Sequence, residues 1–458
     1  MRVLRYGRDF SRRHFLRALA SGAAAGVLMP AWQAIAQNGE SGKAYPEELL
    51  SIDAYTKGRI KTGDEIHAGN VDLIKELIEP IKYIQIKTMG RRLRIVKTTT
   101  DITRLSPIPY LEATLRNRGK GRFDATGNVV TGDGKPWIGG LPFPDSTGAL
   151  EMFAGLTLSW GRHDASLYAI KAYALDPDGE VLYHYDTGWA ELATVGRTVL
   201  DPKPYLTGHE DRLRLQSVFF MTPMSAKGTS FLNVWPYDQN SFPDLYGYVP
   251  EFRRVRQFPT DQRFEPLITG STIYLSDAWA AGDPLNTWGN YRTIGRGPIL
   301  AAVSRGWNSA HPNWEHKTHG GPKGKTFWDT DVELIPEAIE TAAEPVKFPR
   351  APVGRKHVWF DARTQLPVAM VSYDRRGEPF HSFDGAFSLY EDNGKTFKDG
   401  AHPYWSWAHV HAFDVQTGRM TRLEQVKSIT GGHSTSVNDP KIYDKYLTKT
   451  ALVALGLG

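Results

Sequence analysis

Histidine and glutamate side chains gather in one short segment of this sequence. Four groups that commonly bind divalent metals fall within nine residues: His311, Glu315, His316 and His319. Pro312 and the pair Gly320-Gly321 indicate a loop, in which such ligands can converge. His409 and His411 are spaced as on one face of a strand, so they could complete a site for zinc or another divalent ion. No spacing here matches an established metal motif, and a solvated polar loop beside two ordinary strand histidines is the alternative.

Aromatic residues supply a second kind of candidate site. Such side chains can line a pocket for an apolar or ring-shaped ligand. The candidate ligand-binding residues come from two aromatic-rich segments: Trp235, Tyr237, Tyr246, Tyr248, Phe252, Trp405 and Trp407. The alternative is that they fill the core of a β protein. A strongly curved sheet, however, can have a concave face too large for its own side chains to fill, and some aromatic residues would then face a cavity.

Other chemistries lack their residues or their motifs. The chain has no cysteine, which excludes disulfides, thiol nucleophiles, cysteine-ligated clusters and a lipidated N-terminal cysteine. There is no Gly-x-Ser-x-Gly elbow of the kind that presents a catalytic serine. The segment from Gly320 to Thr326 has three residues between its glycines where a phosphate-binding Walker A loop needs four. Catalysis is thus possible, but no motif in the sequence indicates it.

One amphipathic helix precedes the strand-rich part of the chain. Apolar residues recur at the helical spacing i, i+3, i+4 and i+7: Ile74, Leu77, Ile78 and Ile81. This pattern predicts a helix that begins near Asn70 and is limited by Pro80 and then by Gly90. Its polar side would face solvent.

Most later segments are short and rich in aromatic and β-branched residues, which is typical of strands. The clearest are residues 156–160, 166–173, 180–185, 213–221 and 229–235, with a late hairpin that pairs 356–360 with 367–373. Many strands and few helices predict a mainly β (α+β) fold, a large curved antiparallel sheet or half-open β barrel with helices covering its concave face. Without a repeat or a linker, we expect residues 37–458 to form a single large domain with a helical N-terminal part.

The first 36 residues are typical of a twin-arginine export signal. Arg12-Arg13 precedes an apolar stretch, Ala18 to Leu28, and Ala34-Ile35-Ala36 is a small-x-small cleavage site. We therefore expect a cleaved, unlipidated periplasmic protein. The signal carries six arginines against Asp9 alone, so the remaining chain has equal numbers of basic and acidic residues. A balanced chain gives no basis for nucleic-acid binding.

Several motifs in order resemble a family of exported bacterial proteins called domain of unknown function 1329. They are Asn70-Val71-Asp72, residues 139–144 (GGLPFP), residues 248–256 (YVPEFRRVR) and the hairpin from Lys356 to Gly377. Members are similar to the LolA/LolB lipoprotein-sorting proteins, in which a half-open β barrel covered by helices holds acyl chains in an apolar cavity. The resemblance implies a carrier for a hydrophobic molecule such as a lipid or steroid, which hands its cargo to an inner-membrane transporter.

Three hypotheses follow. The favoured one is a periplasmic carrier that binds a hydrophobic molecule without turnover and without a cofactor. The rival is a metal-dependent enzyme in which His311, His316 and His319 hold a divalent ion such as zinc, with help from His409 and His411, to activate water. The third is an assembly subunit whose curved sheet docks a membrane transporter.

Overall fold

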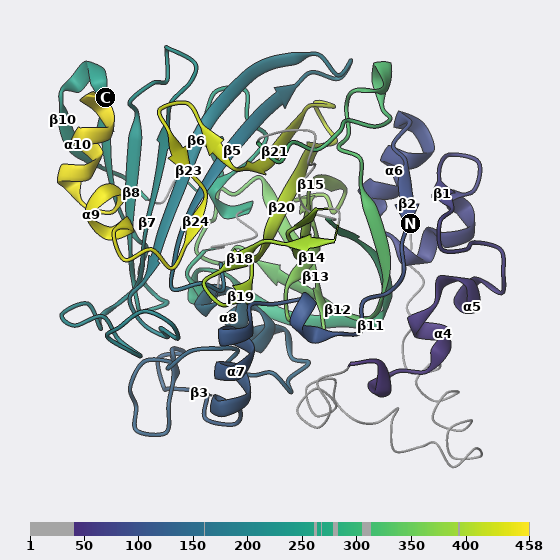
Figure 1. The fold of residues 1–458 in the computed structure, drawn as a ribbon, viewed down its shortest axis with the longest axis horizontal. Coiled ribbons are helices and arrows are strands. Elements are labelled where there is room, and N and C mark those ends of the chain that lie inside the picture. The colour runs from purple at the N-terminus through teal and green to yellow at the C-terminus, as the bar shows by residue number, and fades with distance from the viewer. Residues whose placement is uncertain are drawn as a thin grey trace.

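One curved sheet organises the molecule (Figure 1). The computed structural model describes residues 41–159, 161–260, 263–266, 268–277, 283–304, 313–392 and 394–457, and the predicted export signal, residues 1–36, lies outside them. Sixteen strands join in this sheet. The mainly β fold with a large curved sheet that the sequence predicts is confirmed.

Two series of antiparallel strands make up most of the sheet. The first contains β5 (Ala165–Leu175), β6 (Val181–Ala193), β7 (Arg212–Phe220), β8 (Ser230–Pro236), β9 (Asp244–Val249) and β10 (Arg254–Phe258). The second contains β11 (Gly289–Val303), β12 (Asp331–Glu344), β13 (Val353–Asp361), β14 (Pro367–Asp374), β15 (Pro379–Leu389), β20 (Trp405–Asp414) and β21 (Met420–Val426). β21 pairs with β5 and joins the two series. In the described chain β10 pairs with β9 alone, which leaves one edge of the sheet open.

Short elements complete the sheet and its connections. β1 (Glu65–Ile66) pairs with β2 (Leu93–Ile95), which runs parallel to β12, and Val303 of β11 forms a second parallel pairing with Phe387 of β15. The other short strands are β3 (Arg122–Phe123), β4 (Val129–Val130), β16 (Glu391–Asp392), β17 (Lys395–Thr396), β18 (Lys398–Asp399), β19 (His402–Pro403), β22 (Ser428–Ile429), β23 (His433–Ser434) and β24 (Ser436–Val437). The 3-10 turns are η1 (Gly42–Ala44), η2 (Val71–Leu77), η3 (Ile102–Arg104), η4 (Pro250–Phe252), η5 (Leu275–Asp277), η6 (Leu285–Thr287) and η7 (Pro322–Gly324).

Helices border the sheet on several sides (Figure 1). They are α4 (Glu47–Leu50), α5 (Ile52–Thr56), α6 (Pro80–Met89), α7 (Ile108–Asn117), α8 (Ala149–Leu158), α9 (Ile442–Tyr446) and α10 (Lys449–Leu457). α10 packs on β8 and β9 near one edge of the sheet, whereas α6 packs on β15 in the middle of the strand order. Among the described residues no helix combines the length and the apolar character needed to cross a membrane.

The two faces of the sheet pack against different parts of the chain. A single apolar cluster joins residues of β12, β13, β14, β15, β20 and β5 with α8, so this stretch of the sheet faces one interior. We call this side the inner face. The opposite, outer face packs against α9 and α10 at β5–β8 and against the N-terminal elements at β11 and β12. α8 therefore occupies the concave side, as the sequence predicts for a covering helix.

A bulge in β20 decides which of its side chains face inward. The register shifts between Ala386–His409 and Phe387–Trp407, so Ala408 is an extra residue. As a result Trp407 and Val410 both belong to the inner cluster although they are three residues apart. His409 and His411 share a face, as their spacing predicts, but it is the outer one.

The predicted helix after Asn70 is two elements. Ile74 has non-helical backbone angles (φ −129°, ψ 17°) and breaks the first part, which is the 3-10 turn η2. Pro80 begins α6 instead of ending the earlier helix. A proline fits the first helical position because its missing N–H has no partner there, and it forces the preceding residue, Glu79, into an extended conformation.

The strand predicted at residues 156–160 is wrong, because residues 149–158 form α8. This helix is buried between the sheet and neighbouring segments, with Met152, Phe153 and Ala154 in the inner cluster. Burial on several sides gives a nearly continuous apolar sequence. Such a short apolar run has no periodicity that separates a helix from a strand.

Candidate functional site

An apolar cavity lies on the inner face of β5, β6, β7 and β21. It has a volume of about 770 Å³, including its open mouth. Its lining is apolar and aromatic apart from a few hydroxyl groups, and it contains no charged residue: Ile170, Ala172, Ala174, Tyr185, Thr187, Trp189, Val218, Phe220, Ile268, Ser271, Ile273, Tyr274, Leu275, Phe383, Thr421 and Leu423. We refer to it as the apolar cavity.

Strand alternation explains why space remains there. Ile170, Ala172 and Ala174 point inward from β5, while Lys171 and Tyr173 point to the outer face. Two of the three inward residues are alanine. Because alanine fills little volume, the concave side of the strand keeps a hollow that larger residues would close.

Residues 268–275 form a strap across the cavity. Hydrogen bonds fix this strap to the sheet. The hydroxyl of Thr272 donates to the carbonyl oxygen of Ala412 at 2.9 Å, and its N–H donates to Thr421 Oγ1 at 2.9 Å. The Tyr185 hydroxyl donates to the carbonyl oxygen of Thr269 at 2.9 Å. Two backbone polar groups of the strap are thus satisfied by Thr421 and Tyr185, which themselves line the cavity.

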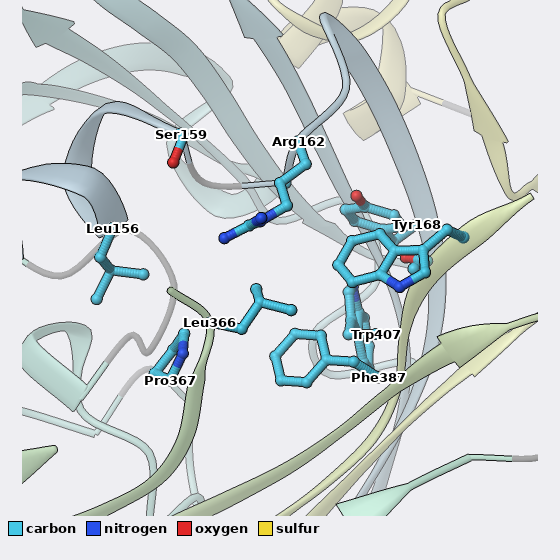
Figure 2. Close-up of a pocket in the computed structure, with 11 residues that line it drawn as sticks. Leu156, Ser159, Arg162, Tyr168, Leu366, Pro367, Phe387 and Trp407 are labelled. Carbon is cyan, nitrogen blue, oxygen red and sulfur yellow. The ribbon is translucent and has the colours of Figure 1, made fainter. Parts of the chain in front are cut away.

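A second pocket, which we call the tryptophan cavity, contains Trp405 and Trp407 (Figure 2). It has a volume of about 390 Å³. Trp405 stacks on Phe387 with ring centroids 5.9 Å apart, and Trp407 meets Tyr168 edge-on at 5.7 Å. Figure 2 shows Arg162 projecting into this space, with Leu366 and Phe387 on the other side. The structure brings these two predicted aromatic residues together.

Hydrogen bonds and a ring contact with uncharged groups position the Arg162 side chain. Its guanidinium donates to Ser106 Oγ at 3.1 Å and to the carbonyl oxygen of Thr364 at 2.7 Å, and it stacks over Tyr110 at 4.7 Å. Burial lowers the pKa of this guanidinium, although arginine stays protonated. The tryptophan cavity therefore has a cation at its wall.

The third pocket, which we call the lysine cavity, adjoins the second. Leu156 and Pro367 line both. The lysine cavity has a volume of about 430 Å³ and contains Lys356, Trp288 and Asp283. Burial lowers the pKa of Lys356 to about 8. The sequence analysis did not single out this lysine, although Lys356, Val358 and Phe360 alternate along β13 and the latter two are inner-face residues.

The other predicted aromatic residues lie apart from these cavities. Trp235 is buried beneath Arg214, whose guanidinium is 4.7 Å from the ring, and the Tyr237 hydroxyl donates to the Val129 carbonyl oxygen at 2.5 Å. Both belong to one small core cluster. The structure thus places these two in packing and hydrogen-bonding roles.

Three further aromatic candidates lie near the open edge of the sheet. Tyr248 packs in the cluster beneath the C-terminal helices, and the Lys449 ammonium sits 3.6 Å from the centroid of Tyr246. Phe252 is 44 % exposed, with the Arg256 guanidinium 3.9 Å from its ring. None of the three lines the cavities described above.

The histidines approach one another on the outer face but form no ligand set among the described residues. The ring of His316 lies 4.7 Å from that of His409, and His409 lies 5.5 Å from His411. His319 instead contacts Glu65 Oε2 at 3.1 Å. His311 lies outside the described residues, and within them no three His, Asp or Glu side chains are placed to hold a metal ion. The metal site remains a prediction.

Buried charges surround these histidines. Asp384 pairs with Lys82 at 3.0 Å and with Arg91 at 2.7 Å, and Arg91 lies 3.5 Å from His411 Nδ1. Burial lowers the pKa of His316 to about 4 and keeps the pKa values of His409 and His411 well below the usual range.

Glu424 meets the same cluster from β21. Its carboxylate accepts the backbone N–H of His316, and burial raises its pKa well above the usual range. Low histidine pKa values and a raised glutamate pKa are consistent with a dry core. A neutral imidazole also presents one ring nitrogen whose lone pair can bind a metal ion.

The fold and its cavities define a mainly β protein with a hollow, largely apolar inner face. Residues 65–453 match the family described as protein of unknown function (DUF1329), and the chain belongs to that family. A comparison with curated proteins found no match.

Several solved structures have some likeness to this one. An outer membrane lipoprotein-sorting protein domain from Vibrio parahaemolyticus is 15 % identical, with a TM-score of 0.41, and the match covers 67 % of this chain and 98 % of that one. A DUF1329 family protein from Desulfovibrio piger is 12 % identical, with a TM-score of 0.41 and coverage of 63 % and 92 %. A LolA superfamily protein from Nitrosomonas europaea is 12 % identical, with a TM-score of 0.36 and coverage of 67 % and 99 %.

Proposed function

We propose that this protein is a periplasmic carrier that binds a hydrophobic molecule, such as a lipid or steroid, on the inner face of its sheet. The observation that carries the proposal is the apolar cavity, whose lining includes no charged residue. Aromatic and aliphatic side chains supply nearly all of that lining, as is usual for pockets that bind apolar molecules. Burial of the ligand's apolar surface would supply the binding free energy.

In this proposal the protein carries its ligand through the periplasm, between the inner and outer membranes. Export depends on the sequence of residues 1–36, and a membrane transporter is the proposed recipient of the cargo. Replacing Arg12 and Arg13 together by lysine is expected to retain the protein in the cytoplasm, which cell fractionation would detect. Normal export of that variant would contradict the twin-arginine route.

The experiment that tests carriage is native mass spectrometry of protein purified without detergent from its own periplasm. Solvent extraction and metal analysis of the same sample accompany it. A stoichiometric apolar molecule without metal is the expected result. Protein without an extractable molecule that also fails to bind added lipid or steroid would contradict the proposal.

A metal-dependent enzyme is the second candidate function, and the closeness of the His316 and His409 rings favours it. In that case the same sample would contain stoichiometric zinc or another divalent ion. Replacing His316 and His409 by alanine would remove the metal. Retention of metal by that variant would exclude this pair as ligands.

A further inference from the structure

Lys356 is a buried cation without an anionic partner in the described chain. Its side chain extends from β13 into the lysine cavity, and the residue is 5 % exposed. Among the described residues its ammonium has no hydrogen bond and no carboxylate within 4.0 Å. It lies instead 3.7 Å from the ring centroid of Trp288 and 5.3 Å from that of Phe153. An aromatic face only partly replaces the water that a buried ammonium loses.

The two nearby carboxylates are engaged by other groups. Asp283 pairs with Arg263 and accepts the indole N–H of Trp288 at 2.6 Å. Asp277 contacts His381 at 2.8 Å and accepts the backbone N–H of Tyr274 at 3.1 Å. Neither carboxylate is therefore available as a close counter-ion for Lys356.

The carboxylates around the lysine cavity act at a distance from Lys356. Asp283 and Asp277 both raise the pKa of this lysine against the effect of burial, but neither oxygen pair lies within 4.0 Å of the ammonium. Asp277 and Asp414 in turn raise the pKa of His381 above the usual range although burial lowers it. An anion placed within hydrogen-bond distance of the Lys356 ammonium in this low-dielectric pocket would therefore gain a strong interaction.

Apolar space continues on two sides of Lys356. Leu156 and Pro367 are shared with the tryptophan cavity. On the other side, Met370 of the lysine cavity lies opposite Phe383 of the apolar cavity in the β14–β15 register. A ligand with its polar end at Lys356 would therefore meet apolar walls in either direction.

We propose that Lys356 binds the anionic group of an amphipathic ligand, so that the cargo is a hydrophobic molecule bearing one oxyanion, a carboxylate or a phosphate. This inference rests on the proposed carrier function and names the class of its cargo. The ammonium would gain the charge-assisted hydrogen bonds that it lacks in the described chain. The apolar body would fill the adjoining cavities.

The test compares three probes with the same chain length: hexadecanoic acid, hexadecanol and hexadecyl phosphate. Their dissociation constants are measured by calorimetry for the wild type, for Lys356→Met, and for Lys97→Met as a control at an exposed lysine. For Lys356→Met we expect the affinity for the acid or the phosphate to fall on the order of tenfold or more, with the alcohol unchanged. Lys97→Met should behave as the wild type. Whichever anion binds the wild type more tightly identifies the head group.

Two results would overturn the inference. One is equal affinity of the wild type for the alcohol and for both anions. The other is an unchanged anion affinity in Lys356→Met. In both cases the carrier function would stand, because apolar probes still bind. Failure of the wild type to bind all three probes would instead contradict the carrier function itself. Circular dichroism and a thermal melt of each variant verify that it is folded.

Discussion

At the scale of single residues, buried ionisable groups differ in whether the protein itself supplies their charged partners. We expect those with partners to stabilise the fold and those without to bind a ligand. Asp384 has two cationic partners at 3.0 Å or less and is satisfied within the protein. Lys356 has an aromatic ring and no close carboxylate among the described residues. A charge that the fold leaves uncompensated reduces stability, which suggests that something other than stability retains it.

The stability effect of Lys356 can be measured directly. Its pKa of about 8 lies below that of an unfolded lysine, so the unfolded chain binds the proton more tightly. The charged lysine therefore opposes folding below pH 8, and this cost disappears as the pH rises toward the unfolded value. We expect Lys356→Met to raise the free energy of unfolding of the ligand-free protein at pH 7 by roughly 1–3 kcal/mol in urea denaturation.

Lys97→Met serves as the control for this measurement and should change stability by less than about 0.5 kcal/mol. A clear loss of stability in Lys356→Met would contradict the account, because it would assign the lysine a structural role. A gain in stability together with a loss of anion binding is the combination that a ligand-binding residue produces.

His316 provides a prediction on the outer face. Burial holds its pKa at about 4, and Glu424 faces it from β21 through the His316 N–H. The folded protein thus keeps this imidazole neutral, whereas the unfolded chain protonates it near pH 6.5. Its contribution to stability is complete above pH 6.5 and is lost as the pH falls toward 4.

Nuclear magnetic resonance measures the pKa of His316 directly, from the chemical shift of its imidazole C–H protons as the pH changes. The variant His316→Gln assigns that signal. The expected midpoint lies below pH 5. A midpoint near 6.5 for His316 would show that the imidazole is in contact with water. Bound zinc would instead abolish the titration and favour the metal site.

At the scale of elements, local capping fixes the position of α6 and of Lys82, which the helix presents to Asp384. Glu79 accepts the N–H groups of Ile81 at 2.6 Å and Lys82 at 2.8 Å, and it is 2 % exposed. Glu79→Ala should lower the free energy of unfolding by about 1–2 kcal/mol, because two helix N–H groups lose their acceptor in a buried place.

Glu48→Ala, a change at an exposed carboxylate in the short helix α4, is the matched control. It should alter stability little. If the two variants were equally stable in urea denaturation, the cap would not position α6 as we describe.

The strands were predictable because their alternation and turn residues are local. β5 to β8 and the β13–β14 hairpin lie where the sequence pattern places them. The break at Ile74 and the helical state of α8 could not be predicted from the sequence, because both depend on tertiary packing of apolar runs. The bulge at Ala408 could not be predicted either, because no residue type in β20 indicates one. This bulge places Trp407 on the inner face and His409 on the outer face.

The candidate site was predictable only in part for a related reason. Trp405 and Trp407 line a cavity, whereas Trp235, Tyr237 and Tyr248 are packed in core clusters, and composition alone cannot separate these outcomes. The apolar cavity depends on small residues, Ala172 and Ala174, which carry no signal of binding in a sequence. Lys356 shows a weak signal, as a charged residue at an inward position of the predicted strand 356–360.

At the scale of the whole molecule, the sheet curves far enough that β5 and β13 contribute to one interior, and the interior is not filled. The strap of residues 268–275 and helix α8 close parts of it. Three adjoining pockets remain, one apolar, one lined by tryptophans and one with a lysine. A hollow of this composition favours an elongated ligand with a large apolar body and a small polar end.

The most direct test of this account is the binding of a fluorescent fatty-acid probe to protein whose apolar cavity has been filled by Ala172→Trp. Ala125→Trp, at an exposed turn position, introduces the same side chain away from the cavity. The account predicts that Ala172→Trp weakens probe binding at least about tenfold while both variants remain folded, and that Ala125→Trp binds as the wild type does. Undiminished binding by folded Ala172→Trp would contradict the claim that the inner face holds the cargo.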